Sequence, residues 1–127
     1  MAKFSTLGSK DIAQLLQSGR RYRSRSLLMF VTPAHCEAAS STQGKVALIA
    51  PKRLGNAVLR NRCKRLLRAG FERSRKNAEI STICDNSSII FMATPKTSEQ
   101  SSVQIAEEIT RLLTEFSNEV THKDRSD

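Results

Sequence analysis

The sequence predicts an α+β fold in which helices cover a central sheet. Three short apolar runs, bounded by polar residues or proline, are typical of buried strands and occupy residues 26–31, 45–50 and 87–93. Apolar residues at helical spacing stand before, between and after these runs, so amphipathic helices are available to cover the sheet. At 127 residues the chain is predicted to be a single domain, residues 1–127, with one hydrophobic core.

The first helix is expected at residues 10–17, after a polar lead-in over residues 1–8. Ser9 is the predicted N-cap because a serine oxygen can accept from the free amides of the first turn. Gly19 is predicted to end the helix. The apolar face consists of Ile12, Leu15 and Leu16.

A basic cluster follows this helix and leads into the first predicted strand. Its arginines surround Tyr22 and are Arg20, Arg21, Arg23 and Arg25. The cluster is either a solvated turn or part of a binding surface, and the sequence favours neither interpretation.

Loops and prolines separate the later elements. Residues 32–44, rich in Ala and Ser, are expected to form a loop between the first two strands. Pro51 ends the second strand because proline has no amide hydrogen to donate, and Thr94 before Pro95 closes the third. Residues 77–86 are weakly patterned and are also expected to form a loop.

The last helix is expected to begin at Ser101, which forms a capping box with Gln104. From Ser117 onward the chain is polar and is expected to fray, so the ordered core is predicted to span about residues 7–117. The apolar stripe of this helix consists of Ile105, Ala106, Ile109, Leu112, Leu113 and Phe116.

Positive charge is concentrated between residues 52 and 76. This stretch holds ten of the chain's 21 Lys and Arg residues but only one of its 12 acids, Glu72. Its net charge of +9 equals the formal net charge of the whole chain. Charge gathered in one fifth of the sequence indicates a polyanionic partner.

The same stretch has helical periodicity from residue 57 to about residue 75, with Asn56 as its predicted N-cap. The apolar arc consists of Leu59, Cys63, Leu66, Leu67, Gly70 and Phe71. The opposite face consists of Asn61, Lys64, Arg65 and Arg68, flanked by Arg62. A solvated face normally interleaves both signs of charge, whereas Arg60, Lys64 and Arg68 repel one another at spacings of four. A phosphate backbone would relieve that repulsion, and arginine suits it because its planar guanidinium binds phosphate oxygens in pairs.

The basic helix resembles a known family. Residues 57–68, AVLRNRCKRLLR, are similar to the arginine-asparagine-arginine signature of the bacterial ribonuclease P protein subunit, and residues 51–56, PKRLGN, to its basic dipeptide and glycine turn. The resemblance implies the element order α-β-β-β-α-β-α, with an additional short strand near residues 21–23. It also implies a left-handed crossover through the basic helix, although right-handed crossovers are the general rule.

In that family the protein binds a catalytic RNA and contacts the 5′ leader of precursor tRNA. The RNA carries out the metal-dependent hydrolysis that removes the leader. The resemblance therefore implies two partners, ribonuclease P RNA and precursor tRNA, in a one-to-one cytoplasmic ribonucleoprotein. It implies no cofactor bound by the protein alone, with magnesium ions held in the RNA–protein complex, and neither a membrane nor DNA as partner.

The resemblance also assigns site residues by position. Those implied to face the catalytic RNA are Arg60, Asn61, Arg62, Lys64, Arg65 and Arg68. Those implied near the metal-rich junction of the RNAs are Lys52, Arg53 and Asn56. Those implied to line a leader channel between the first helix and the sheet are Ile12, Leu16 and Phe30. Asn61 either bridges RNA groups or orients its neighbours.

Three positions depart from the family's usual pattern. Ile12 and Leu16 stand where aromatic side chains are usual, so base stacking in the leader channel is expected to be weaker. Ala93 and Thr94 replace a basic pair at the end of the last strand, and the 77–86 segment is longer than usual. These departures concern leader recognition rather than the helix signature. Ile12 and Leu16 are also consistent with a role as core residues alone.

No catalytic or metal-binding set is apparent in the sequence. His35 and His122 are isolated, and Cys36, Cys63 and Cys84 form neither a CxxC pair nor an even set, which favours reduced thiols. No apolar run is long enough to span a membrane, and no signal peptide is visible.

The main alternative function is that of a general RNA-binding protein, such as a ribosomal protein or an RNA chaperone. A DNA-binding regulator is disfavoured because an extended strand and Pro51, rather than helix-turn-helix spacing, precede the basic helix. An independent protein nuclease is disfavoured because the basic region offers only one carboxylate, Glu72.

Overall fold

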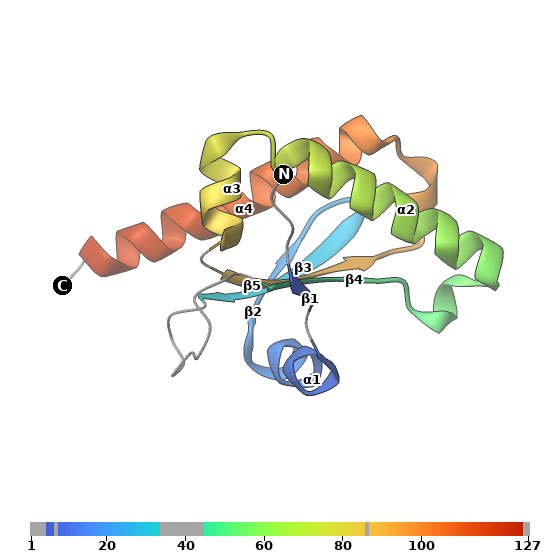
Figure 1. Ribbon diagram of the computed structural model, residues 1–127, viewed down its shortest axis with the longest axis horizontal. Coiled ribbons are helices and arrows are strands. Elements are labelled where there is room, and N and C mark those ends of the chain that lie inside the picture. The colour runs from blue at the N-terminus through green and yellow to red at the C-terminus, as the bar shows by residue number, and fades with distance from the viewer. Residues whose placement is uncertain (1–4, 7, 34–44, 86, 126–127) are drawn as a thin grey trace.

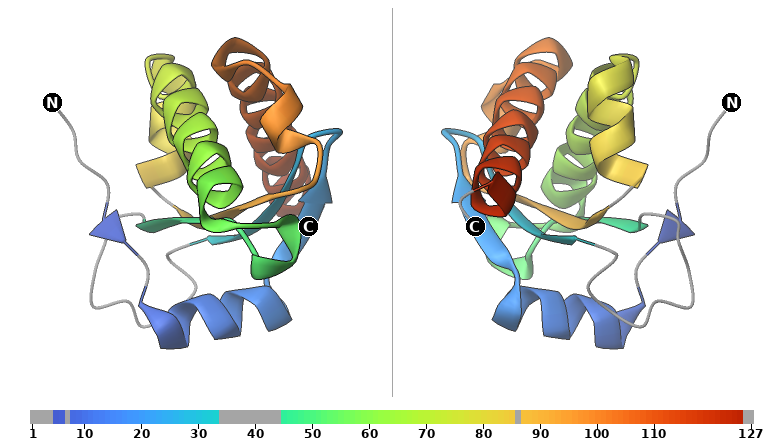
Figure 2. Two further views of the ribbon diagram at one scale, coloured as in Figure 1. Left: turned by 90° about the vertical axis from the view of Figure 1, so that its right-hand side faces the viewer. Right: turned by 90° about the vertical axis from the view of Figure 1, so that its left-hand side faces the viewer.

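A computed structural model describes residues 5–6, 8–33, 45–85 and 87–125, and its architecture is a sheet with helices on both faces (Figure 1). Helix α1 covers one face, and α2, α3 and α4 lie on the other (Figures 1 and 2). The predicted α+β class is confirmed. The helices are α1 Ser9–Ser18, α2 Ala57–Ser74, α3 Ala78–Asp85 and α4 Ser102–Arg125, with short 3-10 turns η2 Lys52–Leu54 and η3 Thr97–Glu99. The strands are β1 Ser5–Thr6, β2 Arg20–Arg23, β3 Leu27–Pro33, β4 Lys45–Ile49 and β5 Ser87–Ala93.

The sheet is mixed, with the strand order β1-β4-β5-β3-β2. Strands β4 and β5 are parallel neighbours, and β3 pairs antiparallel with both β5 and β2. Figure 2 (left) views the sheet from the carboxyl ends of β4 and β5, with α2 above it and β1, the neighbour of β4, on the left. The chain therefore passes from β4 rightward to β5 through helices above the sheet, which is the left-handed crossover that the family resemblance implied. The implied short strand near residues 21–23 is β2.

The main core lies between the sheet and helices α2, α3 and α4. Phe71 on α2 packs against Phe91 on β5, with ring centroids 5.5 Å apart. Helices α2 and α4 approach closely at Gly70, where an added Cβ would lie 2.4 Å from Cγ2 of Ile105. Cys63 is 2% exposed, as expected for a small core residue. A smaller cluster fills the space between α1 and the opposite face of the sheet.

The prediction of a loop at residues 77–86 was wrong, because residues 78–85 form helix α3. Asn77 caps the helix: its Oδ1 accepts from the backbone N–H of Glu79 at 2.8 Å and of Ile80 at 3.3 Å. Ile80 and Cys84, one turn apart, are buried in the main core. Two buried positions give too short a pattern to reveal a helix, and its stability comes from packing against the rest of the domain.

At both ends of the described chain, regular secondary structure extends beyond the predicted elements. Ser5–Thr6, within the expected polar lead-in, forms β1 and pairs with β4. The tail expected to fray from residue 117 continues α4 to Arg125. Phe116 is buried against Tyr22, and the Glu119 carboxylate accepts a hydrogen bond from the Tyr22 hydroxyl, so contacts with β2 hold this part of the helix.

Several element boundaries also differ from the predictions. Helix α1 begins at Ser9 rather than after it, because the N–H of Ile12 bonds to the Gly8 carbonyl and makes Gly8 the N-cap. Gly19 ends α1 as predicted. Strand β3 extends to Pro33, which pairs with Ser87. The rest of the predicted 32–44 loop, with His35 and Cys36, lies outside the described residues.

Buried polar groups fix the turn between β2 and β3 to α4. The Glu108 carboxylate is 7% exposed and accepts bonds from the Ser26 backbone N–H and the Ser26 hydroxyl, both at 3.0 Å, and from the Ser24 hydroxyl. The Thr97 hydroxyl donates to the Ser26 carbonyl. Ser101 caps α4: its Oγ accepts from the N–H of Gln104 at 3.2 Å, which is one of the two bonds of the predicted capping box. The turn is therefore tied to both η3 and α4.

The buried thiol of Cys84 makes stability sensitive to alkaline pH. Burial, the main cause, raises the pKa of the Cys84 thiol above its ordinary value to about 12. Above pH ~9 the unfolded chain loses this proton while the folded chain keeps it, so the free energy of unfolding falls as pH rises. We expect wild type to lose at most about 1.4 kcal/mol per pH unit more than Cys84→Ala in this range. Urea denaturation of both proteins at several alkaline pH values measures this, and equal slopes would contradict it.

Candidate RNA interface

The amino end of α2 is built by a tight basic turn. Pro51 leads into the 3-10 turn η2, and Gly55 follows with a φ of 143°, a conformation that favours glycine. Asn56 then caps α2, its Oδ1 accepting from the N–H of Leu59 at 3.0 Å, which confirms the predicted N-cap. Lys52 and Arg53 are exposed on this turn, so two cations stand beside the start of the basic helix.

Helix α2 separates an apolar side from a cationic side. Cys63, Leu67 and Phe71 are buried on the first side. The exposed polar residues of the second side are Asn61, Arg62, Lys64, Arg65 and Arg68. Residues 57–71 contain no acid, and the one carboxylate of α2, Glu72, comes a turn after Arg68. The helix thus presents uncompensated positive charge over several turns, as the sequence predicted.

Arg60 differs from the other arginines of this helix. It is half-buried, and its Nε donates to the backbone carbonyl of Ala50 at 3.3 Å. This bond ties the first turn of α2 to the residue that follows β4. Arg60 therefore has a structural contact that the sequence did not reveal, and its remaining guanidinium nitrogens are the ones available to a ligand.

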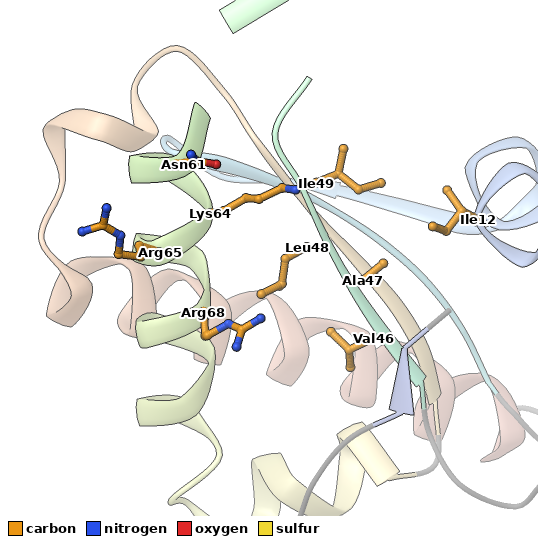
Figure 3. Close-up of a pocket in the computed structure, with 9 residues that line it drawn as sticks. All are labelled: Ile12, Val46, Ala47, Leu48, Ile49, Asn61, Lys64, Arg65 and Arg68. Atoms are coloured by element: carbon orange, nitrogen blue, oxygen red, sulfur yellow. The ribbon is translucent and has the colours of Figure 1, made fainter. Parts of the chain in front are cut away.

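A groove of about 620 Å³ runs between the cationic side of α2 and β4 (Figure 3). Lys64 and Arg68 point from α2 toward β4, whereas Arg65 turns away from the strand (Figure 3). Ile12 of α1 lies at the opposite end of the groove from the helix. The residues that line it are Ile12, Val46, Ala47, Leu48, Ile49, Asn61, Lys64, Arg65 and Arg68.

The three residues of the implied leader channel do not have the same surroundings. Phe30 is 9% exposed and belongs to the cluster between α1 and the sheet, and Ile12 packs against that cluster. Leu16 is 36% exposed and is not part of the cluster. The structure therefore brings Ile12 and Phe30 together and leaves Leu16 on the outer side of α1.

Residues 2–117 match the model of the family Ribonuclease P. The chain belongs to this family. The resemblance seen in the basic helix is thereby confirmed, and the match extends to nearly the whole chain.

Individual relatives agree with this family assignment. The ribonuclease P protein component of Desulfovibrio desulfuricans is 34% identical over 64 residues, which cover 50% of this chain and 47% of that protein. The match thus spans about half the length of this relative. The Staphylococcus aureus RNase P protein structure aligns with a TM-score of 0.66 at 19% identity, covering 89% of this chain and 94% of the other. The Thermotoga maritima RNase P protein structure aligns with a TM-score of 0.65 at 18% identity, covering 86% of this chain and 94% of the other. At these identities the structures establish the fold.

This ribonuclease P family member has two further cations near the α1 face of the sheet. Tyr22 faces α4, so the alternation of side chains places Arg21 and Arg23 of β2 on the α1 side. Arg21 pairs with Phe30 across the strands, and Arg23 with Leu28. Both arginines are exposed. The alternating arginines of RRYR were a signal for this placement, but their partners on β3 could not be read from local sequence.

The described part of this family member offers no metal centre. In residues 5–6, 8–33, 45–85 and 87–125, no three His, Cys, Asp or Glu side chains come together as metal ligands. Within those same ranges, no helix combines the length and the apolar character needed to cross a lipid bilayer. Cys63 and Cys84 are buried free thiols.

Proposed function

We propose that this protein is the protein subunit of ribonuclease P. It binds the catalytic RNA and the 5′ leader of precursor tRNA, and it assists the RNA-catalysed removal of that leader. The observation that carries the proposal is the exposed cationic side of α2, free of acids from residue 57 to residue 71, in a chain of this family. Such a surface suits a phosphate backbone.

The cationic side of α2 docks on the catalytic RNA in this proposal. The residues assigned to that contact are Arg60, Asn61, Arg62, Lys64, Arg65 and Arg68. The turn residues Lys52, Arg53 and Asn56 lie at the amino end of the helix and approach the junction of the two RNAs. Phosphate contacts of this kind fix position and affinity without reading bases, so the docking is expected to depend strongly on salt.

The leader runs along the α1 face of the sheet in this proposal. Phe30 and Ile12 share one cluster there, and Leu16 lies on the exposed side of α1. Arg21 and Arg23 add positive charge at the β2 edge of the same face. Aliphatic side chains stack poorly on bases, so the leader is held mainly through its backbone and with little base preference.

The chemistry belongs to the RNA in this proposal, and magnesium ions held in the RNA–protein complex would supply the metal assistance that the hydrolysis needs. The protein contributes binding and orientation, as one RNA-binding domain over residues 1–127 in a one-to-one cytoplasmic complex. Neither DNA nor a membrane is a partner.

Precursor-tRNA cleavage tests the proposal. We expect bacterial ribonuclease P RNA at low magnesium to cleave at the mature 5′ end only when this protein is added, and the protein alone to cleave nothing. Specific cleavage by the protein without RNA would overturn the proposal. Binding to that RNA without any restoration of cleavage would reduce the function to general RNA binding.

A further inference from the structure

We propose that Lys64 and Arg68 hold the single-stranded leader of the substrate in the groove between α2 and β4, whereas Arg62 and Arg65 hold the catalytic RNA. This inference rests on the proposed function and divides the cationic side of α2 between two RNAs. It refines the contact proposed above: of the side chains assigned there to the catalytic RNA, Lys64 and Arg68 are given to the leader, and Arg62 and Arg65 remain with the catalytic RNA.

Among the residues that the structure describes, the outer edge of β4 is open beside the side chains of Lys64 and Arg68. Strand β1 pairs with β4 only at Lys45 and Val46. Within the described residues, no strand pairs with the outer edge at Ala47–Ile49, and the chain after β1 continues into α1 instead. An unpaired strand edge offers backbone N–H and C=O groups to a ligand.

The side chains of α2 are directed to different sides of the helix. Lys64 and Arg68 are one turn apart and both point toward β4 in Figure 3. Arg65 is also a lining residue of the groove, but its guanidinium turns away from the strand. Arg62 is exposed and does not line the groove. One pair of cations therefore serves the groove, and the other serves the outer surface of the helix.

The chemistry of the groove suits a single strand of RNA. One wall is cationic, and the floor consists of apolar side chains and backbone from β4. Sites for single strands combine a positive groove that follows the backbone with aromatic side chains that stack on bases, and this groove supplies the first of these two features. A duplex hides its bases and presents phosphates on a broad outer surface, so it fits the outer side of α2 better than this groove.

Continuity with the α1 face identifies which single strand enters. The groove reaches Ile12, and Ile12 packs against the cluster that contains Phe30. A leader lying along the α1 face can thus pass over the open edge of β4 to α2 and stay in contact with the protein throughout. This continuity with the face proposed for the leader favours the leader as the occupant of the groove.

The test compares three double variants in the reconstituted RNA–protein complex. Lys64→Ala with Arg68→Ala removes the groove cations, and Arg62→Ala with Arg65→Ala removes the outer ones. Arg73→Ala with Lys76→Ala is the matched control, because Arg73 in the last turn of α2 and Lys76 just beyond that helix are both exposed and do not line the groove. Each variant protein is assayed for its affinity for the catalytic RNA. Each reconstituted complex is then assayed for its affinity for two precursor tRNAs, one with a leader of several nucleotides and one with a leader of one nucleotide.

We expect the groove variant to weaken binding of the long-leader substrate about tenfold, with changes below about twofold for the one-nucleotide leader and for the catalytic RNA. We expect the control variant to change none of these affinities by more than about twofold. The inference is overturned if the groove variant weakens catalytic-RNA binding as much as the outer variant does, or if both substrates lose affinity equally. Failure of the proposed function is distinguishable, because wild-type protein would then not stimulate cleavage of either substrate.

Discussion

Replacing Arg62 and Arg65 together by alanine is expected to weaken binding to bacterial ribonuclease P RNA by about 10- to 100-fold at ~0.1 M salt. Both side chains are exposed on the cationic side of α2, and neither has a carboxylate of its own helix stretch beside it. A guanidinium that binds phosphate releases counterions, so its contribution to affinity is greatest at low salt. Removing two such groups therefore changes both the affinity and its dependence on salt.

The salt dependence gives the more diagnostic measurement. If about six phosphates are neutralised, log K for wild type falls against log salt with a slope of about −4 to −5. The double variant is expected to flatten that slope by about one to two units. Filter binding or fluorescence titration at several salt concentrations measures both quantities. Circular dichroism checks that the variant is folded. The Arg73→Ala, Lys76→Ala double variant loses the same net charge and is the control for that loss. An unchanged slope would show that the outer side of α2 is not the docking surface.

The parts of the fold that could be predicted have strong local signals. Helix α2 was predicted at nearly its true bounds because Gly55 and Asn56 mark its start and its apolar arc repeats from Leu59 to Phe71. Strand β5 was predicted at its true bounds because a buried apolar run ends before a proline. The crossover hand was available only through the family resemblance, since general rules favour the opposite hand.

The parts that could not be predicted depend on contacts distant in sequence. Helix α3 is held by burial of Ile80 and Cys84 in a core built by other elements. The last turns of α4 are held through Tyr22, which is 97 residues from Glu119. Neither contact leaves a periodic pattern long enough to be recognised.

The candidate site divides in the same way. The cations of α2 were identifiable from their number and spacing along one helix. The groove was not, because it needs β4 to end its pairing with β1 at Val46 and needs Ile12 to reach the same space from α1. The tie between Arg60 and the Ala50 carbonyl likewise depends on how η2 turns the chain back toward the sheet. Sequence therefore predicted the chemistry of the surface but not its shape.

Replacing Glu108 by alanine is expected to lower the free energy of unfolding by about 3 kcal/mol. The Glu108 carboxylate is the common acceptor for the Ser24 hydroxyl and for the N–H and hydroxyl of Ser26, and Ser26 is fully buried. Alanine would leave these donors without that acceptor in a buried site, and each buried donor left unpaired costs about 1–3 kcal/mol. Water can partly enter the emptied site and pair with these donors, so the expected loss lies near the lower end of the summed cost of the three donors.

Urea denaturation measures this loss of unfolding free energy. The dependence of the free energy of unfolding on urea concentration is compared between the proteins as well. Glu107→Ala is the matched control, because Glu107 is exposed on the same turn of α4 and its loss is expected to cost less than about 0.5 kcal/mol. Glu108→Gln keeps one acceptor oxygen and the side-chain volume, so an intermediate loss is expected from it. Since Glu108 fixes the turn that follows Arg21 and Arg23, the alanine variant should also weaken long-leader substrates more than it weakens catalytic-RNA binding. A loss for Glu108→Ala as small as that for Glu107→Ala would mean that the turn does not depend on this carboxylate.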